Sequence, residues 1–243
     1  MAIIEVQDFK KSFGEKVVHN GVTFYVKKGE CLGLVGGSGT GKSVLLRSLI
    51  GLEKPDSGKI LINGQEASLF TELQWQQVRK KVAYAFQGGA LFDSMTVFEN
   101  LSYPLLEHTT LTSLEIKNKI LKQLEEFGLA GSDKLYPNEL SGGMQKRVGL
   151  ARAMMLEPEI ILYDEPTAGL DPYNTKNIQE VILKLKSKGV TSILVTHDMP
   201  TAFAVCDKFA FLKDKKIIEQ GTIEQLRTMK DSMINQFIEG KII

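Results

Sequence analysis

The sequence Gly36-Gly37-Ser38-Gly39-Thr40-Gly41-Lys42-Ser43 has the spacing of the phosphate-binding P-loop: a glycine, four residues, then Gly-Lys-Ser. An apolar run, residues 31–35, comes before it, and residues 43–50 follow it with the apolar spacing of a helix. Strand, glycine loop and helix is the order that a P-loop requires. We therefore favour this interpretation over a plain flexible turn.

A P-loop predicts a bound nucleoside triphosphate. Small residues allow successive backbone N–H groups to surround phosphate oxygens, and the helix N-terminus adds a partial positive charge. Lys42 is expected to reach the β- and γ-phosphates, and Ser43 to be a ligand of Mg²⁺. The predicted nucleotide-binding residues of this segment are Gly36, Gly37, Ser38, Gly39, Thr40, Gly41, Lys42, Ser43 and Val44.

A second apolar run, residues 160–163, ends in the carboxylates Asp164 and Glu165. A parallel strand here would place both side chains near the P-loop. Asp164 is then the candidate metal ligand, and Glu165 the candidate for orienting or deprotonating the attacking water. A solvated strand end is the alternative for this run taken alone, and the P-loop favours the catalytic interpretation.

A third motif is Leu140-Ser141-Gly142-Gly143-Met144, in which Ser141 is placed as the N-cap of a helix. The two glycines Gly142 and Gly143 leave backbone N–H groups bare, so the motif predicts a second anion site. A plain capped surface helix explains the same residues when they are taken in isolation.

Composition excludes several classes of protein. The 243 residues carry 30 Lys+Arg and 29 Asp+Glu, so a net charge of +1 provides no basic field for nucleic acid. No apolar run approaches the roughly 18–20 residues of a membrane span, and no secretory signal is recognisable. Cys31 and Cys206 are expected to be buried and reduced. Because the three histidines are scattered, any metal is expected to have oxygen ligands.

The chain reads as one α/β domain of residues 1–243. Strand-like alternation at both ends predicts a core of residues 1–87 and 158–221, a P-loop NTPase fold with a mixed, mainly parallel sheet and an antiparallel β subdomain. Helical periodicity predicts an inserted α-helical subdomain at 88–157. Residues 222–243 form an amphipathic tail. Packing on its own domain is the favoured role of the tail, and contact with a second copy is the alternative.

The ordered set of motifs resembles the ABC transporter ATPases. The resemblance covers nearly the whole chain, from Phe13-Gly14 through the P-loop, Gln87, the Ser141 motif and Asp164-Glu165 to Asp171 and His197. It implies an ATP- and Mg²⁺-dependent ATPase that acts as a homodimer. Two chains would sandwich two ATP molecules, with Ser141 acting on the nucleotide of the partner.

The resemblance also implies roles for residues outside the P-loop. Phe13 would stack on adenine beside Val18, with core packing of the aromatic ring as the less favoured alternative. Gln87 would contact the Mg²⁺ and water region, Asp171 would lie at the dimer seam, and His197 would bond the γ-phosphate. The chain departs from the common pattern at Val44 and Met144, which predicts altered affinity with the catalytic residues Lys42, Gln87, Glu165 and His197 retained.

These departures and the segment 87–105 resemble the ATPase of Mla-type, MCE-associated phospholipid transport systems. The resemblance implies peripheral attachment at the cytoplasmic face of the inner membrane, through an integral permease alone, with an MCE-domain lipid-binding protein and a possible small regulatory subunit as further partners. Leu91, Phe92 and Phe98 would line the permease groove, at least one of them being core instead.

Two alternatives stay open, and a third is disfavoured. The chain could serve another ABC transporter, an amino-acid importer or an exporter. It could be a cell-division ABC ATPase that acts as a switch on a membrane partner. ABC ATPases acting on DNA or ribosomes are disfavoured, because the chain has neither a long heptad stretch nor room for a second cassette.

Overall fold

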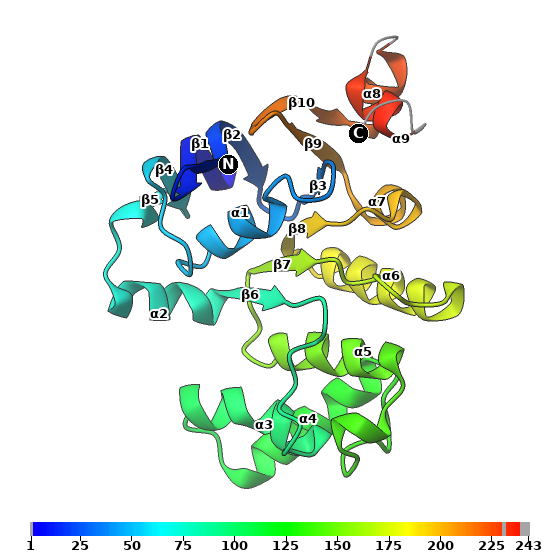
Figure 1. The fold of residues 1–243 in the computed structure, drawn as a ribbon. Coiled ribbons are helices and arrows are strands. Elements are labelled where there is room, and N and C mark those ends of the chain that lie inside the picture. Colours follow the sequence, from blue (N-terminus) through cyan, green and yellow to red (C-terminus); the bar gives the residue numbers. More distant parts are fainter. Residues whose placement is uncertain (1, 230–231, 239–243) are drawn as a thin grey trace.

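Two sheets form the centre of the molecule (Figure 1). The computed structural model describes residues 2–229 and 232–238. The larger sheet has the order β10-β9-β3-β8-β7-β6, in which β9, β3, β8, β7 and β6 are parallel and β10 is antiparallel to β9. Its strands are β3 (Cys31–Val35), β6 (Val82–Ala85), β7 (Ile160–Asp164), β8 (Thr191–Val195), β9 (Lys208–Lys213) and β10 (Lys216–Thr222). The predicted mixed, mainly parallel sheet is confirmed.

The smaller sheet is antiparallel, with the order β2-β1-β4-β5. Its strands are β1 (Ala2–Phe13), β2 (Lys16–Lys27), β4 (Ser57–Ile62) and β5 (Gln65–Glu66). Alternating apolar residues of β1 and β2 face the interior, as the sequence pattern predicted. This sheet is the antiparallel β subdomain.

Helices flank both sheets, and α3, α4 and α5 gather at the bottom of Figure 1 as the inserted helical subdomain. The helices are α1 (Lys42–Ser48), α2 (Glu72–Lys81), α3 (Val97–His108), α4 (Ser113–Glu126), α5 (Gly142–Ala153), α6 (Pro172–Ser187), α7 (Met199–Val205), α8 (Ile223–Thr228) and α9 (Met233–Ile238), with 3₁₀ turns η1 (Ala67–Leu69) and η2 (Pro137–Glu139). Sequence periodicity missed α2, because Trp75 alone among its residues is buried. The exact subdomain boundaries stay a prediction.

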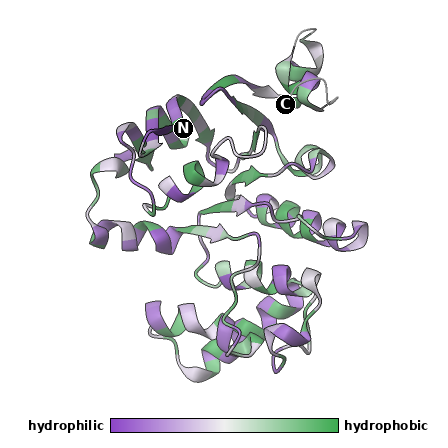
Figure 2. Cartoon of the chain, viewed as in Figure 1, coloured by the Kyte–Doolittle hydropathy of each residue, from purple (hydrophilic) through white to green (hydrophobic). Residues whose placement is uncertain are grey.

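The larger sheet separates two hydrophobic cores. Successive residues of its strands point alternately into one core and the other, as Ile161 and Leu162 of β7 do. One core lies against α1 and the smaller sheet, and the other lies against α5, α6 and α7. Figure 2 shows the resulting contrast between apolar central strands and striped outer helices. Because the strands are buried on both faces, their positions are fixed. The candidate functional residues follow directly after the ends of these strands.

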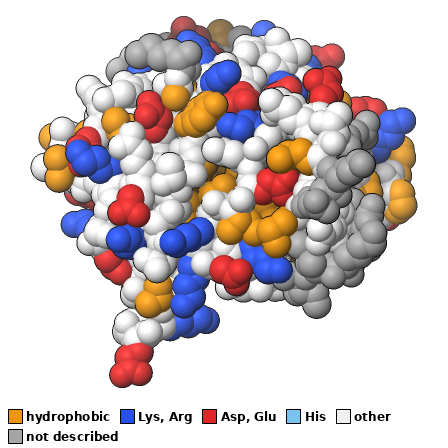
Figure 3. Space-filling model, turned by 90° about the horizontal axis from the view of Figure 1, so that it is seen from above, with side chains coloured by type: hydrophobic (Ala, Val, Ile, Leu, Met, Phe, Trp, Pro, Cys, Tyr) orange, Lys and Arg blue, Asp and Glu red, His pale blue; other side chains and the backbone are white. Residues whose placement is uncertain are grey.

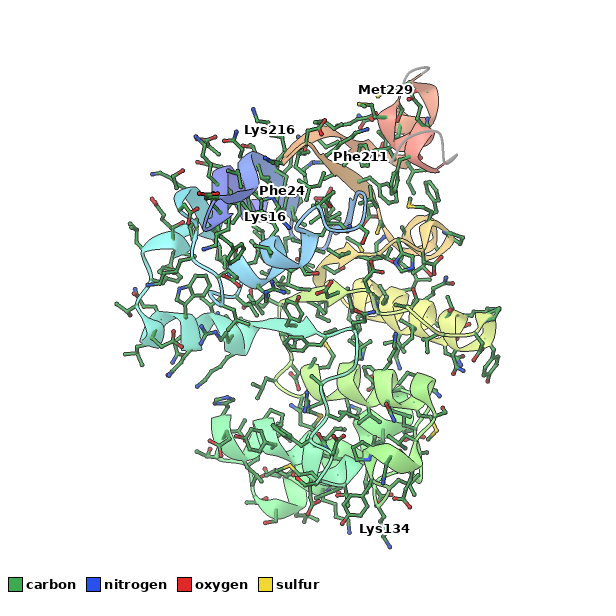
Figure 4. The ribbon with its side chains drawn as sticks, viewed as in Figure 1. Lys16, Phe24, Lys134, Phe211, Lys216 and Met229 are labelled. Atoms are coloured by element: carbon green, nitrogen blue, oxygen red, sulfur yellow. The ribbon has the colours of Figure 1, made fainter. Side chains whose placement is uncertain are left out.

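The C-terminal segment divides into two short helices, α8 and α9, rather than one amphipathic helix. Leu226 and Ile234 are buried in the core of the chain's own domain. The ring of Phe237 lies 5.1 Å from that of Phe211 in β9, which is labelled in Figure 4. The apolar face of the described tail therefore packs on its own domain. Residues 230–231 and 239–243 lie outside the described part, and contact with a second copy stays a prediction.

The surface carries both signs of charge. On the face in Figure 3, Lys and Arg side chains are interspersed with Asp and Glu, and apolar side chains form small groups. Within the described residues, no helix combines the length and apolar character that crossing a bilayer requires.

Asn100 of α3 organises the loop between β6 and α3. Its side chain is fully buried, and its Oδ1 accepts a bond of 2.9 Å from the Phe92 backbone N–H. Its Nδ2 donates to the carbonyls of Phe92 at 3.1 Å and Met95 at 3.0 Å. The amide thus replaces the backbone partners that this irregular segment lacks.

Asn100→Ala is expected to destabilise the fold by about 2–3 kcal/mol, because it leaves buried loop groups without partners. Chemical denaturation monitored by circular dichroism measures the change. Asn118→Ala on the exposed face of α4 is the matched control and should cost far less. Equal stability of the two variants would contradict a structuring role for Asn100.

Candidate active site

The P-loop joins the end of β3 to the start of α1, as predicted, and two of its glycines are sterically required. Gly36 has φ 155°, and a Cβ there would lie 2.3 Å from the Leu212 carbonyl oxygen. Gly41 has φ 96°, and its Cβ would lie 2.4 Å from Val18 Cγ1. Any larger residue would push the loop away from β9 or β2. The neighbouring strands therefore fix the path of the loop.

Lys42 lies inside the loop it terminates. Its Nζ donates to the carbonyls of Gly36 at 2.8 Å and Gly37 at 2.9 Å. Burial lowers the pKa of Lys42, while the nearby carboxylates of Glu165 and Asp164 act to raise it. The ammonium group is thus held against the carbonyls at the start of the loop, in the cavity that the loop lines, where it could also meet phosphate oxygens.

Asp164, at the end of β7, meets Ser43 as predicted. Ser43 Oγ donates to Asp164 Oδ1 at 2.9 Å, and the hydroxyl of Tyr84 in β6 donates to Asp164 Oδ2 at 2.7 Å. Burial, and then the bond to Asp164, raise the pKa of Tyr84 well above its usual range, so the hydroxyl remains a donor. Sequence reasoning missed Tyr84, because nothing in the strand pattern marks it.

The oxygen atoms of Ser43 and Asp164 are ligands that suit magnesium. Mg²⁺ prefers oxygen ligands and is commonly held by one or two carboxylates together with substrate phosphates. Ser43 and Asp164 supply a hydroxyl and a carboxylate within 2.9 Å of each other. Among the described residues, no cluster of three or more His, Cys, Asp or Glu could bind a metal ion instead. With a hydroxyl and a carboxylate from the protein, a Mg²⁺ ion here would take its remaining ligands from water and from the phosphates of the nucleotide.

Glu165 and His197 come together from the ends of β7 and β8. His197 Nδ1 lies 2.9 Å from Glu165 Oε2, and the His197 backbone N–H donates to the same oxygen at 3.2 Å. Glu165 has φ 52°, the left-handed region, which is strained for a residue other than glycine. Such strain is typical of catalytic positions. The pair sets a carboxylate beside an imidazole, two groups that general acid–base chemistry uses.

A cavity of about 1120 Å³ connects these groups with the end of β1. Phe13 is exposed at its edge and Val18 lines it, so Phe13 is not a core residue. The cavity is also lined by Lys16, which Figure 4 labels, and by Lys215, neither of which the sequence pointed out. All the P-loop residues predicted to bind nucleotide line the cavity except Gly37, whose carbonyl bonds Lys42.

Five predicted residues lie away from this cavity in the described chain: Gln87, Ser141, Gly142, Gly143 and Asp171. Asp164 does not line it either, but bonds Ser43, which does. Ser141 caps α5, its Oγ accepting from the Met144 N–H at 3.3 Å, and Asp171 caps α6. Gln87 is exposed just after β6. The separation of Ser141 from the cavity fits the expectation that it serves a nucleotide on another chain, whereas Gln87, expected in the Mg²⁺ and water region, does not line the cavity. The roles of all five residues stay predictions.

A second hollow, about 360 Å³, lies between the core and the helical subdomain. We call it the β6 groove, and its aromatic lining comprises Tyr84, Phe86, Phe92 and Tyr103. Phe92 is 43% exposed, whereas Leu91 and Phe98 pack against the core that lies beside α5, α6 and α7. Of the three residues predicted to line a docking groove, Phe92 is thus the one found there.

Comparison with known proteins gives concordant results. The family model of the ABC transporter matches residues 19–168. The chain is 38% identical over 239 residues to the intermembrane phospholipid transport ATP-binding protein MlaF of Escherichia coli K12, covering 98% of this chain and 89% of that protein. It is 41% identical over 241 residues to the probable ribonucleotide transport ATP-binding protein mkl of Mycobacterium leprae, covering 99% and 70%.

A similar solved structure is a dimeric ATP-binding cassette in a post-hydrolysis state, bound to ADP and Pi. It is 29% identical and superposes with a TM-score of 0.83, covering 90% of this chain and 98% of that one.

Proposed function

Because the chain belongs to the ABC transporter family, we propose that it is the ATP-hydrolysing subunit of a transporter, dimerising around two Mg-ATP and driving a separate permease that moves phospholipid. The observation that carries this proposal is the site itself: P-loop, Asp164, Glu165 and His197 line or flank one cavity. The near full-length similarity to MlaF supports phospholipid as the substrate class.

Each of the candidate residues has its own role in ATP binding or hydrolysis. Lys42 and the loop N–H groups bind the phosphates, and Phe13 stacks on the base. Ser43 and Asp164 would hold Mg²⁺, which supplies charge neutralisation between the β- and γ-phosphates. Glu165 orients and deprotonates water, and His197 bonds the γ-phosphate. Ser141, Gly142 and Gly143 of a second chain would close the site, with Asp171 at the seam and Gln87 near the metal.

The β6 groove supports docking of a permease. Its lining combines four aromatic side chains with Arg79, Lys80 and Arg152, and it is set against the inserted helical subdomain, so an amphipathic helix of an integral membrane subunit suits it. The chain would then lie peripherally at the cytoplasmic face of the inner membrane through that contact. An MCE-domain lipid-binding protein and a small regulatory subunit complete the proposed system.

Isolation of the native complex in detergent tests the proposal. We expect an integral permease and an MCE-domain protein to co-purify, with phospholipid as the bound small molecule detected by mass spectrometry. Bound ribonucleotide as cargo would favour the function in the name of the Mycobacterium leprae relative, ribonucleotide transport, and an amino-acid-binding protein would favour an importer. A cell-division partner without a permease would refute transport altogether.

A further inference from the structure

Tyr84 contacts both the predicted metal site and the β6 groove, to which the proposed function gives different roles. Its hydroxyl donates to Asp164 Oδ2 at 2.7 Å, on the side of the predicted metal site. Its ring lies in the wall of the β6 groove, with the Phe86 ring 4.3 Å away and inclined by 37°. One side chain therefore spans from the groove to the carboxylate.

The bond to Tyr84 determines how Asp164 is presented. Ser43 Oγ donates a hydrogen bond to Oδ1 and the Tyr84 hydroxyl donates one to Oδ2. Both carboxylate oxygens therefore have a hydrogen-bond partner in the described structure. Strands β6 and β7 pair in parallel with Tyr84 opposite Leu162, which fixes the Tyr84 backbone two residues before Asp164. The rotation of the carboxylate is thus set by Ser43 and Tyr84 together, and Tyr84 is the one of the two that also lines the β6 groove.

We propose that Tyr84 is a positioning residue, which orients Asp164 for magnesium and couples that orientation to the occupancy of the β6 groove. The proposal rests on the proposed function for the identity of the metal and of the nucleotide. Groups that hydrogen-bond to metal-ligating carboxylates fix their geometry, and their loss commonly weakens metal affinity by about 10–100-fold. A segment that enters the groove contacts the Tyr84–Phe86 pair directly, and a shift of the ring moves the hydroxyl with it.

The first test compares Tyr84→Phe with Tyr103→Phe in the full chain. Both variants remove one hydroxyl from a tyrosine that lines the same groove, and no hydrogen bond of the Tyr103 hydroxyl is found in the described structure. Calorimetric titration with a non-hydrolysable ATP analogue gives affinity with Mg²⁺ and, separately, with EDTA. For Tyr84→Phe we expect about tenfold weaker binding with Mg²⁺ and unchanged binding in EDTA. Tyr103→Phe should match the wild type in both.

The second test addresses the groove. Phe86→Ala removes the partner ring while leaving the Tyr84 hydroxyl in place. We expect it to weaken Mg²⁺-dependent binding severalfold in the wild-type background and to have no further effect in Tyr84→Phe. Additive effects would overturn the coupling, because the two side chains would then act independently.

The outcomes separate this inference from the proposed function. A wild-type chain that binds no nucleotide with Mg²⁺ refutes the ATPase assignment. Magnesium-dependent binding in the wild type, with Tyr84→Phe indistinguishable from it, overturns the role of Tyr84 alone. Thermal unfolding without ligand accompanies each variant, and equal midpoints show that any loss of affinity is not a loss of folding.

Discussion

A chain carrying Glu165→Gln is expected to bind ATP with near wild-type affinity and to hydrolyse it about 10²–10⁴-fold more slowly. The amide keeps the size of the side chain and can still accept the His197 N–H, which bonds Glu165 Oε2 at 3.2 Å. It cannot accept the proton of an attacking water. Phosphate release and size-exclusion chromatography with ATP measure the two consequences: turnover is lost, and the ATP-bound dimer accumulates.

Glu157→Gln provides the matched control. Like Glu165, Glu157 has a positive φ, 53°, but it pairs with Lys119 at 2.5 Å, outside the nucleotide cavity. Its neutralisation should leave hydrolysis within about twofold of the wild type, since a surface ion pair contributes about 0–1 kcal/mol. Substantial turnover in Glu165→Gln would refute Glu165 as the base.

Lys42→Ala is expected to weaken ATP binding by about 10–100-fold, the equivalent of the roughly 1.5–3 kcal/mol of a hydrogen bond to a charged group. The substitution removes the cation at the centre of the P-loop and its bonds to the Gly36 and Gly37 carbonyls. The loop then loses both its attraction for phosphate and its closed shape. Equilibrium titration with fluorescent ATP measures the affinity directly.

Lys208→Ala distinguishes lost affinity from lost stability. Lys208 is as buried as Lys42, each side chain belonging to a residue 8% exposed, but its Nζ lies over the Tyr25 ring at the opposite end of the sheet. Both variants remove a buried lysine, and Lys42→Ala alone should weaken ATP binding. A similar loss of affinity in both would indicate general destabilisation and contradict the phosphate-binding role of Lys42.

The sequence was most informative where chemistry restricts the residue type. The P-loop spacing identified Lys42 and Ser43, and the apolar run ending in Asp164-Glu165 predicted a strand whose end lies beside them, as the bond between Ser43 and Asp164 confirms. His197 followed from order along the chain, and the structure places it against Glu165. Each of these residues stands at a strand end or helix start that local pattern defines.

The parts that escaped prediction depend on tertiary contacts. Tyr84 occupies an ordinary strand position, and its bond to Asp164 arises from the pairing of β6 with β7. Lys215 reaches the nucleotide cavity because a tight turn joins β9 to β10, where both Asp214 and Lys215 have positive φ. Helix α2 is mostly solvated, so periodicity carries little signal for it. Such features require knowing which strands are neighbours.

The buried amide of Asn100 has a consequence for assembly. Its bonds to Phe92 and Met95 order the loop that carries Phe92 into the β6 groove while the chain is alone. A docking helix therefore meets a preorganised surface, and the entropy of arranging that loop does not oppose association. We expect the cassette and its membrane partner to join largely as rigid bodies, with little change in the backbone of this loop.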